Sequence, residues 1–510
     1  MSLQSRLRVC PTKPRVFIIS DISNEPDDAE SFVRYLLYSN EFDTRGLVAC
    51  TSTWMKKAVH PEDMVKIIKA YDQVVHNLNQ HVHPNNSFSP GQHFLDILKT
   101  GPVLYGKQAL NPDLTLSEGA KLLIDRLNES DEPLWVLCWG GTNVVAQALI
   151  HLSKDQQFSA EDHRRIRSRL RVYAISDQDD TGIWIRHHYP DIFYIVSLHG
   201  WNQYGNATWT GISGDKFYGF DKGGPNFTQV STKWIRENIQ IGPLGKAYPD
   251  YMFIPEGDTP TFLYLIQNGL GSREHPEWGS WGGRYLPVDV SGDSLFKHYH
   301  DTADRVVGAN GKIFRSNHAT IWRWRTAFQN DFAARIQWTL SDDTSKANHA
   351  PVVSINGGSA GPEPLFLEAQ AGSSIELDAS NSYDPDGGEL IFEWLHYKDV
   401  TATQWILDLE VATIEFEDVD KTKPGRHVRC KMPEPERCAV DHFTGQPQSK
   451  GQIMHLILAV TDKGTPPMTT YKRVVVQTLN TALKGARPAH ESVAAAQSAL
   501  RELAGNWLQE

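Results

Sequence analysis

Residues 16–28 read Val16-Phe17-Ile18-Ile19-Ser20-Asp21-Ile22-Ser23-Asn24-Glu25-Pro26-Asp27-Asp28, so that four carboxylates follow directly after an apolar run. The run from Val16 to Ile19 predicts a fully buried β-strand, and residues 29–38 carry apolar side chains at helical spacing. The acidic residues therefore lie in a turn between a strand and a helix. In open α/β sheets, ligands bind at the edge that such turns form.

Four carboxylates this close together repel one another, and a hard cation or the hydroxyl groups of a ligand would relieve the repulsion. Calcium prefers oxygen ligands of this kind, so the turn is a candidate calcium site. A simpler alternative is that Asp27 and Asp28 cap the following helix, favoured by its dipole, while Asp21 and Glu25 are solvated.

The composition is that of an ordinary globular protein, with 510 residues, 40% of them hydrophobic, which is enough for two or three domains. A net charge of −11 without a cluster of Lys and Arg argues against nucleic acid as a partner. No run of about 18 apolar residues occurs, so no membrane partner is expected. Five cysteines without CxxC spacing indicate neither a disulfide framework nor a zinc site. The first residues lack the apolar core of a signal peptide, which predicts a cytoplasmic protein, or a secreted one if a leader has been removed.

Two further buried strands are predicted at 134–139 and 170–176, and each is followed by a polar turn and a helix. The first turn is Gly140-Gly141-Thr142-Asn143, and the second is Asp177-Gln178-Asp179-Asp180. A strand at 47–54 brings Trp54 to the same sheet edge, whereas the Asn-, His- and Pro-rich residues 77–105 predict a long irregular connection. The glycine pair could form only a tight turn, and the second acidic turn could be a helix cap with solvated acids.

Three motifs of the chain resemble those of a known family. The pattern Asp21-x-Ser23-x-x-x-Asp27-Asp28 is similar to the Asp-x-Asp-x-x-x-Asp-Asp signature of the nucleoside hydrolases. The wording Asp-Ile-Ser-Asn-Glu-Pro-Asp-Asp is closer to a related group, the nucleoside-hydrolase-like domain of proteins described as cellulose-binding. The strand-Gly-Gly-Thr-Asn-helix unit and Glu256-Gly257-Asp258, before an apolar helix, resemble two later motifs of the nucleoside hydrolases.

The resemblance implies an α/β fold of the nucleoside-hydrolase type, with a mostly parallel, Rossmann-like sheet flanked by helices. It also implies one Ca²⁺, held by Asp21, Asp28, the backbone carbonyl of Thr142 and Asp258, while Asp27 binds a sugar hydroxyl. Asp258 could instead be a simple helix cap.

Two positions depart from the family pattern. Ser23 replaces the aspartate that is the presumed base, and a serine cannot activate water alone at neutral pH. Gly257 replaces the histidine that is the leaving-group acid in some relatives. The base is therefore open among Glu25, Asp179 and a water polarised by Asp21, and we expect the catalytic residues among Glu25, Asp27 and Asp179.

The substrate is expected to meet polar and aromatic side chains at the sheet edge and in the loops beyond it, since amides, carboxylates and indole rings suit sugar recognition. The candidates are Asn24, Trp54, Asp177, Gln178, Asp180, Asn202, Trp278 and Trp281. For the loop with Trp278 and Trp281, a packed aromatic loop without a ligand is an equally good interpretation.

The character of the chain changes to β after residue 350, with alternating segments and turn signals that resemble an immunoglobulin-like sandwich of the polycystic-kidney or cadherin type. The predicted domains are an extension at 1–13, the α/β domain at 14–345, the β-sandwich at 350–480 and a helical tail at 486–510.

The expected function is a calcium-dependent hydrolase of an N- or O-glycosidic bond in a nucleoside-like or carbohydrate substrate. The alternative is a non-catalytic saccharide-binding protein, of the cellulose-binding type, on the same fold. The expected partner is a small sugar, a glycoside or an oligosaccharide, and formation of a homo-oligomer is left open.

Overall fold

The computed structural model describes residues 3–154, 158–199, 201–213, 221–289, 296–401, 411–441, 444–487 and 490–507. The chain folds into two compact units. The first comprises Met1–Gln267 and Gly271–His349, and the second comprises Asn268–Leu270 and Ala350–Glu510.

The first unit is built on an eight-stranded sheet in the order β3-β2-β1-β4-β5-β6-β8-β7. Its strands are β1 (Arg15–Ser20), β2 (Asp43–Ala49), β3 (Leu98–Thr100), β4 (Leu134–Cys138), β5 (Leu170–Ser176), β6 (Phe193–Ser197), β7 (Tyr285–Pro287) and β8 (His298–Asp301). All neighbours pair in parallel except β7 and β8, which pair antiparallel. The mostly parallel sheet predicted from the apolar runs is confirmed.

The chain reverses its direction of travel across the sheet at β1. It runs from β1 outward to β2 and β3, and then crosses to β4 on the other side of β1. The point at which the strand order reverses opens a crevice at the carboxyl ends of the strands, and ligands of doubly wound sheets bind there. The acidic turn after β1 lies at this point.

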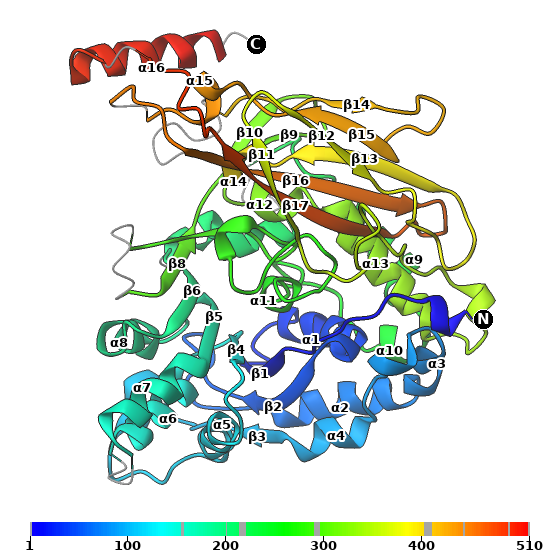
Figure 1. Ribbon diagram of the computed structural model, residues 1–510. Coiled ribbons are helices and arrows are strands. Elements are labelled where there is room, and N and C mark those ends of the chain that lie inside the picture. The colour runs from blue at the N-terminus through cyan, green and yellow to red at the C-terminus, as the bar shows by residue number, and fades with distance from the viewer. Residues whose placement is uncertain are drawn as a thin grey trace. The chain divides into compact units, whose positions relative to one another are not determined.

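Helices cover both faces of the sheet (Figure 1). They are α1 (Asp27–Tyr38), α2 (Pro61–Asp72), α3 (Val75–Gln80), α4 (Gly91–Asp96), α5 (Glu118–Asn128), α6 (Asn143–Lys154), α7 (Ala160–Arg169), α8 (Asp180–His188), α9 (Thr232–Asn238), α10 (Gly242–Gly245), α11 (Pro260–Leu263), α12 (Ala319–Trp322) and α13 (Arg325–Trp338). The apolar faces of α5 and α6 share one core with β1, β4 and β5, including Leu123, Val145, Val136 and Val172. Burial of both faces explains why these strands are apolar throughout.

Two shorter elements complete the first unit, and one expectation is wrong. Strands β9 (Asp304–Val307) and β10 (Ile313–Ser316) form a separate antiparallel pair. The region 77–105, expected to be irregular, contains α4 and the edge strand β3, which pairs with β2 through Leu98, Lys99 and Thr100. A strand of three residues is too short to show a periodic pattern, which explains the error.

The second unit contains two sheets that share one apolar core. One has the order β11-β17-β16-β13 and the other the order β12-β15-β14, and all pairs are antiparallel except β11 with β17. Its elements are β11 (Leu365–Gln370), β12 (Ser374–Asp378), β13 (Leu390–His396), α14 (Lys398–Thr401), β14 (Phe416–Asp418), β15 (His427–Lys431), α15 (Pro435–Cys438), β16 (Lys450–Asp462), β17 (Thr469–Leu479) and α16 (Val493–Trp507). Leu377 and Val428 from one sheet pack with Leu456 and Val474 from the other, as the predicted β-sandwich requires.

None of the helices in the described residues combines the length and the apolar character that crossing a membrane requires.

Candidate functional site

A cavity of about 350 Å³ opens at the carboxyl edge of the sheet in the first unit. It is lined by Asn24, Glu25, Asp27, Trp54, Ile175, Ser176, Gln178, Trp209, Phe253, Ile254, Gly257 and Asp258. Six of these residues were predicted from the sequence as site residues: Asn24, Glu25, Asp27, Trp54, Gln178 and Asp258. Segments after β1, β2 and β5 and before α11 therefore meet at one pocket.

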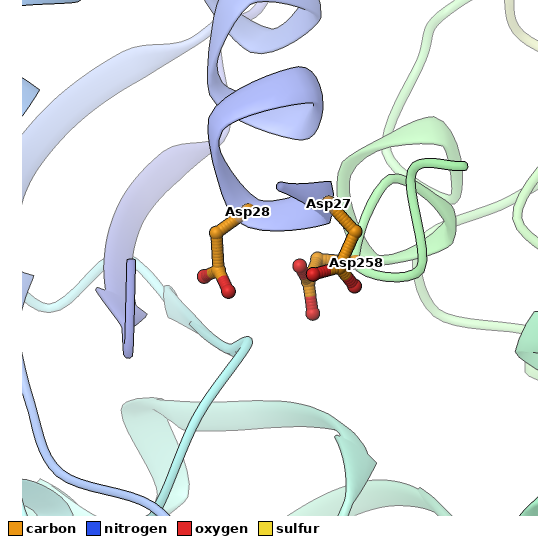
Figure 2. Close-up of side chains that lie close together, drawn as sticks. All are labelled: Asp27, Asp28 and Asp258. Carbon is orange, nitrogen blue, oxygen red and sulfur yellow. The ribbon is translucent and has the colours of Figure 1, made fainter. Parts of the chain in front are cut away.

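Three carboxylates lie close together (Figure 2), and two of them, Asp27 and Asp258, line this pocket. Asp27 and Asp28 come from the first turn of α1, and Asp258 comes from the segment before α11. One carboxylate oxygen from each lies within 4.8 Å of the other two. Asp28 and Asp258 are 3% and 2% exposed, which is rare for acids without a cationic partner. Oxygens in this arrangement could hold a metal ion.

Asp27 and Asp28 lie in the first turn of α1, where the helix dipole favours a carboxylate, but none of the three acids is an N-cap residue. The N-cap residue of α1 is Pro26 and that of α11 is Thr259, and neither helix has a side-chain cap hydrogen bond. The Ser20 hydroxyl donates to Asp28 Oδ1, but Asp258 Oδ2 is buried and has no hydrogen-bond partner among the described residues. A buried, unsatisfied carboxylate oxygen is costly, so a cation or a hydrogen-bond donor at this oxygen would stabilise the site.

Burial and mutual repulsion raise the pKa values of these groups. Burial, followed by the charges of neighbouring acids, holds the pKa values of Asp27, Asp28 and Asp258 well above the usual range of a carboxyl group. Burial also raises the pKa of Asp21 to about 6, although a hydrogen bond with Ser52 opposes the rise. The neighbouring charges that act on these groups are all carboxylates, so a bound cation would stabilise the site.

A buried polar network fixes the backbone that carries Asp258. Glu256 adopts the left-handed region, with φ 55°, and its backbone N–H donates to Glu30 Oε2 at 2.9 Å. The Glu256 carboxylate accepts from Arg34 Nη1 at 2.9 Å and from the Tyr248 hydroxyl at 3.0 Å. Because Glu30 and Arg34 lie on α1, the same helix that presents Asp27 and Asp28 positions the turn with Asp258.

The Gly-Gly-Thr-Asn turn fits tightly between the two acidic turns. A Cβ atom on Gly140 would lie 2.8 Å from Asp21 Oδ1, and a Cβ atom on Gly141 would lie 2.5 Å from Asp179 Oδ2. Glycine is therefore needed at both positions for the close approach. The backbone carbonyl of Thr142, predicted as a metal ligand, accepts the N–H of Ala146 at 3.1 Å as part of α6.

Asp179 is held by several donors and does not line the pocket. Its carboxylate accepts from the backbone N–H groups of Thr181, at 2.8 Å, and of Asn143, at 3.1 Å. The hydroxyl groups of Thr181 and Thr142 also donate to it. Asp179 is the N-cap of α8, so the cap interpretation of this turn fits the structure.

The other two acids of this turn also bind protein groups. Asp177 forms an ion pair with Arg186 and accepts from the Tyr194 hydroxyl at 3.0 Å. Asp180 accepts the backbone N–H of Lys107 at 2.7 Å. Only Gln178 reaches the pocket, and its side-chain amide donates to the carbonyl of Trp139.

The remaining predicted site residues divide between the pocket and other surroundings. Trp54 lines the pocket and is 54% exposed. Trp281 is buried against Phe328, and Trp278 stacks on His275, so neither contributes to the pocket lining. The side chain of Asn202 lies outside the described part of the structure.

The structure shows what surrounds the two positions, Ser23 and Gly257, that depart from the family pattern. Ser23 has a φ of 84°, and its exposed hydroxyl donates to Asp63 on α2 instead of facing the three carboxylates. Gly257 lines the pocket, and a Cβ atom there would lie 2.6 Å from Asp27 Oδ2 and 3.3 Å from the Trp209 ring. The structure therefore leaves little room for a side chain at position 257.

Several lining residues could not be predicted from the sequence pattern. The pairing of β5 with β6 shifts between Ala174 and Ser176, which indicates a β-bulge at Ile175. Consecutive strand residues normally face opposite sides, but at this bulge both Ile175 and Ser176 line the pocket. Trp209 lies on the short helix η6 (Thr208–Ile212), and Phe253 lies before α11. Both come from irregular segments without a periodic signal, although the polar and aromatic composition around Trp209 favours a recognition loop.

The comparisons agree with the fold. A family model described as "Cellulose-binding Sde182, nucleoside hydrolase-like domain" matches residues 15–285, and one described as "Cellulose-binding protein Sde0182, C-terminal domain" matches residues 374–478. Neither description specifies an immunoglobulin-like type for the second unit, so that type stays a prediction. Among curated proteins, none matches the sequence.

One solved structure gives the same result. A nucleoside hydrolase-related hypothetical protein from Saccharophagus degradans, associated with carbohydrate metabolism, is 28% identical with a TM-score of 0.72, and the match covers 92% of this chain and 100% of that one. An inosine-uridine preferring nucleoside hydrolase from Bacillus anthracis is 12% identical over 65% of this chain and 100% of that one, with a TM-score of 0.31. The second likeness is too weak to carry an argument. By the match of its first unit, this chain belongs to the cellulose-binding, nucleoside-hydrolase-like family.

Proposed function

We propose that the pocket is a calcium-dependent site that hydrolyses a glycosidic bond in a carbohydrate or nucleoside-like substrate. The observation that carries the proposal is the group Asp27, Asp28 and Asp258, whose oxygens lie within 4.8 Å of one another beside a cavity of ligand size. The unsatisfied Asp258 Oδ2 supports it, because a bound cation would give that oxygen a partner. Carboxylate oxygens are the ligands that calcium prefers.

Asp28 and Asp258 would hold the ion from two sides, with Asp27 as a third ligand or as the partner of a sugar hydroxyl. Asp21, predicted from the sequence as a further ligand, lies outside the group of three, but it is 2% exposed and its charge acts on Asp28, so it would add negative charge to the site. The Thr142 carbonyl already accepts a helical hydrogen bond, so only its second lone pair is left for an ion. When bound, calcium would supply a fixed positive charge that orients sugar hydroxyls and a water.

Glu25 is the best candidate for the general base. Glu25 lines the pocket, which Asp179 does not, and Glu25 lies outside the group of three carboxylates. Partial burial raises the pKa of Glu25, and a less acidic carboxyl group is a better proton acceptor. In this role Glu25 would accept a proton from the water that attacks the anomeric carbon. Position 257 has no side chain to protonate the leaving group.

A second candidate function is saccharide binding without cleavage. The direction of the Ser23 hydroxyl, toward Asp63, and the small space at Gly257 favour it, because the usual base and acid positions are both vacated. The cellulose-binding description of the family favours a saccharide ligand in either case.

Melting curves and an activity screen test the proposal together. We expect calcium to raise the melting temperature relative to EDTA, because a ligand that binds only the folded state stabilises it by mass action. A panel of glycosides and nucleosides should contain a substrate, and Glu25→Gln should lower its kcat by about 100-fold or more while keeping the calcium shift. Glu62→Gln, an exposed acid on α2, is the matched control and should change neither.

The outcomes separate the two functions. Absence of a calcium shift would reject the metal site. If the wild-type protein and Glu25→Gln both bind saccharides in a calcium-dependent way and neither releases a product, hydrolysis is rejected and the second candidate function, saccharide binding, is supported.

A further inference from the structure

The pocket has an inner part and a mouth that differ in exposure, and both contain aromatic side chains. Trp209 is half-buried inside, next to the acidic group, whereas Trp54 and Phe253 are 54% and 56% exposed. Large aromatic side chains that remain exposed around a cavity indicate a contact surface for a ligand. A saccharide as the ligand rests on the proposed function.

The inner wall is flat, apolar and held in place. Trp209 Nε1 donates to Ser176 Oγ at 3.1 Å, which fixes the ring against the end of β5. The backbone N–H of the preceding Thr208 donates to Asp301 Oδ1 at 2.9 Å, which ties this segment to β8. A Cβ atom on Gly257 would contact both the Trp209 ring and Asp27 Oδ2, so ring and carboxylate flank the same point of the backbone.

The Trp209 ring and the Asp27 carboxylate together suit one sugar ring. A pyranose presents C–H groups on its faces and hydroxyl groups around its edge, so it can lie on an indole while its edge meets carboxylates. The missing side chain at Gly257 is what lets the indole come so close to the acidic group.

The mouth is also ordered, at least on the side of Trp54. Ser52 Oγ accepts the backbone N–H groups of Trp54, at 3.0 Å, and of Met55, at 3.2 Å. The N–H of Thr53 donates to the carbonyl of Gln178 at 2.7 Å, which anchors the loop to the turn after β5. An exposed aromatic ring on an anchored loop loses little conformational freedom when a ligand stacks on it.

The lining of the cavity indicates where a second sugar would lie. At about 350 Å³ it lies at the lower end of the range for small-molecule sites, roughly 300–1,000 Å³. Trp54 and Phe253 belong to the lining of this cavity, so a ligand that extends from Trp209 toward solvent contacts these exposed rings. We propose that the site takes the end of an oligosaccharide, with its terminal sugar on Trp209 beside the carboxylates and the next sugar on Trp54 and Phe253.

Calorimetric titration with glucose, cellobiose and inosine in calcium tests this arrangement. We expect cellobiose to bind about tenfold more tightly than glucose, because only cellobiose reaches the mouth. Trp54→Ala and Phe253→Ala should each weaken cellobiose binding by about three- to tenfold and change glucose binding by less than about twofold. Trp209→Phe should weaken both sugars alike. Met252→Ala is the control, because Met252 is 62% exposed next to Phe253 and does not line the pocket.

Equal affinities for glucose and cellobiose, or equal losses for both sugars in Trp54→Ala and Phe253→Ala, would overturn the arrangement with two sugars. Tighter binding of inosine than of either saccharide would overturn the choice of ligand. Other results would reject the proposed function and leave the arrangement with two sugars intact. Saccharide binding that persists in EDTA, or that leads to no hydrolysis, would contradict that function while the pattern of aromatic variants still supports two sugar positions.

Discussion

Two acidic turns follow buried strands of the same sheet, and they have opposite surroundings. The turn after β5 meets donors, since Asp179 accepts from the backbone of Asn143 and Thr181, and Asp177 pairs with Arg186. The turn after β1 meets other acids, since the charges that act on Asp28 are those of Asp21, Asp27 and Glu25. The acids that act on Asp28 belong to its own turn, whereas the donors to Asp179 and Asp177 come from the segment after β4 and from α8.

This contrast separates structural acids from functional ones. A buried carboxylate with several donors stabilises the fold, and its loss leaves those donors unsatisfied. A buried carboxylate among other carboxylates destabilises the metal-free fold, and a bound cation would relieve this repulsion. The two turns should therefore respond in opposite ways to removal of charge.

The largest effect is expected for Asp179→Ala. The substitution leaves two buried backbone N–H groups, of Asn143 and Thr181, without an acceptor, and each unsatisfied group costs about 1–3 kcal/mol. We expect the free energy of unfolding to fall by about 4 kcal/mol in urea denaturation. Asp179→Asn, which keeps one acceptor oxygen, should lose less. A loss below about 1 kcal/mol in Asp179→Ala would contradict the structural role.

The next effect concerns the calcium shift. At a calcium concentration of about 100 times Kd, the ion should stabilise the wild-type protein by about 2.7 kcal/mol. Asp258→Asn should lose this shift, because it removes a charged ligand from the group of three. Asp177→Asn should keep it, since Asp177 is bound to Arg186 outside the pocket. Loss of the shift in both variants would show that the two turns do not differ as described.

The sequence predicts the location of the site and its acidic turn, but it does not predict the donors that surround Asp179. The apolar run before Asp21 and the helical spacing after Asp28 determine the turn, because both signals are local. The partners of Asp179 are not local: Thr142 lies 37 residues away, and it arrives only because Gly140 and Gly141 allow close approach. The bulge at Ile175, which turns Ser176 into the pocket, also depends on pairing with β6 and leaves no pattern in the sequence.

A smaller effect distinguishes single charges in the two turns. In EDTA, Asp177→Asn should lower the free energy of unfolding by about 1 kcal/mol, because it weakens a partly buried ion pair with Arg186. Asp27→Asn should leave stability unchanged or raise it, because it removes repulsion from Asp21 and Glu25. Urea denaturation of both variants beside the wild-type protein measures the difference. A loss of the same size in both would mean that repulsion around Asp27 is relieved without a ligand.

The smallest effect is a pH dependence on the side of β5. His298, on β8, is 8% exposed, and burial followed by the charge of Arg186 lowers its pKa from 6.5 to about 4. In the unfolded chain, His298 therefore binds a proton as the pH falls below 6.5. In the folded protein it binds this proton only near pH 4. This group contributes stability above pH 6.5, and that stability is lost progressively as the pH falls toward 4.

His298→Leu should remove this acid lability. His298 Nε2 is buried without a hydrogen-bond partner among the described residues, so the substitution by leucine breaks no hydrogen bond of that nitrogen. Melting temperatures of the variant and the wild-type protein, measured in EDTA between pH 7.5 and 5, should therefore converge or cross in favour of the variant toward acid pH. A constant difference across this range would mean that His298 takes up its proton in the folded protein. The charge of Arg186 would then be neutralised by Asp177 more completely than the structure indicates.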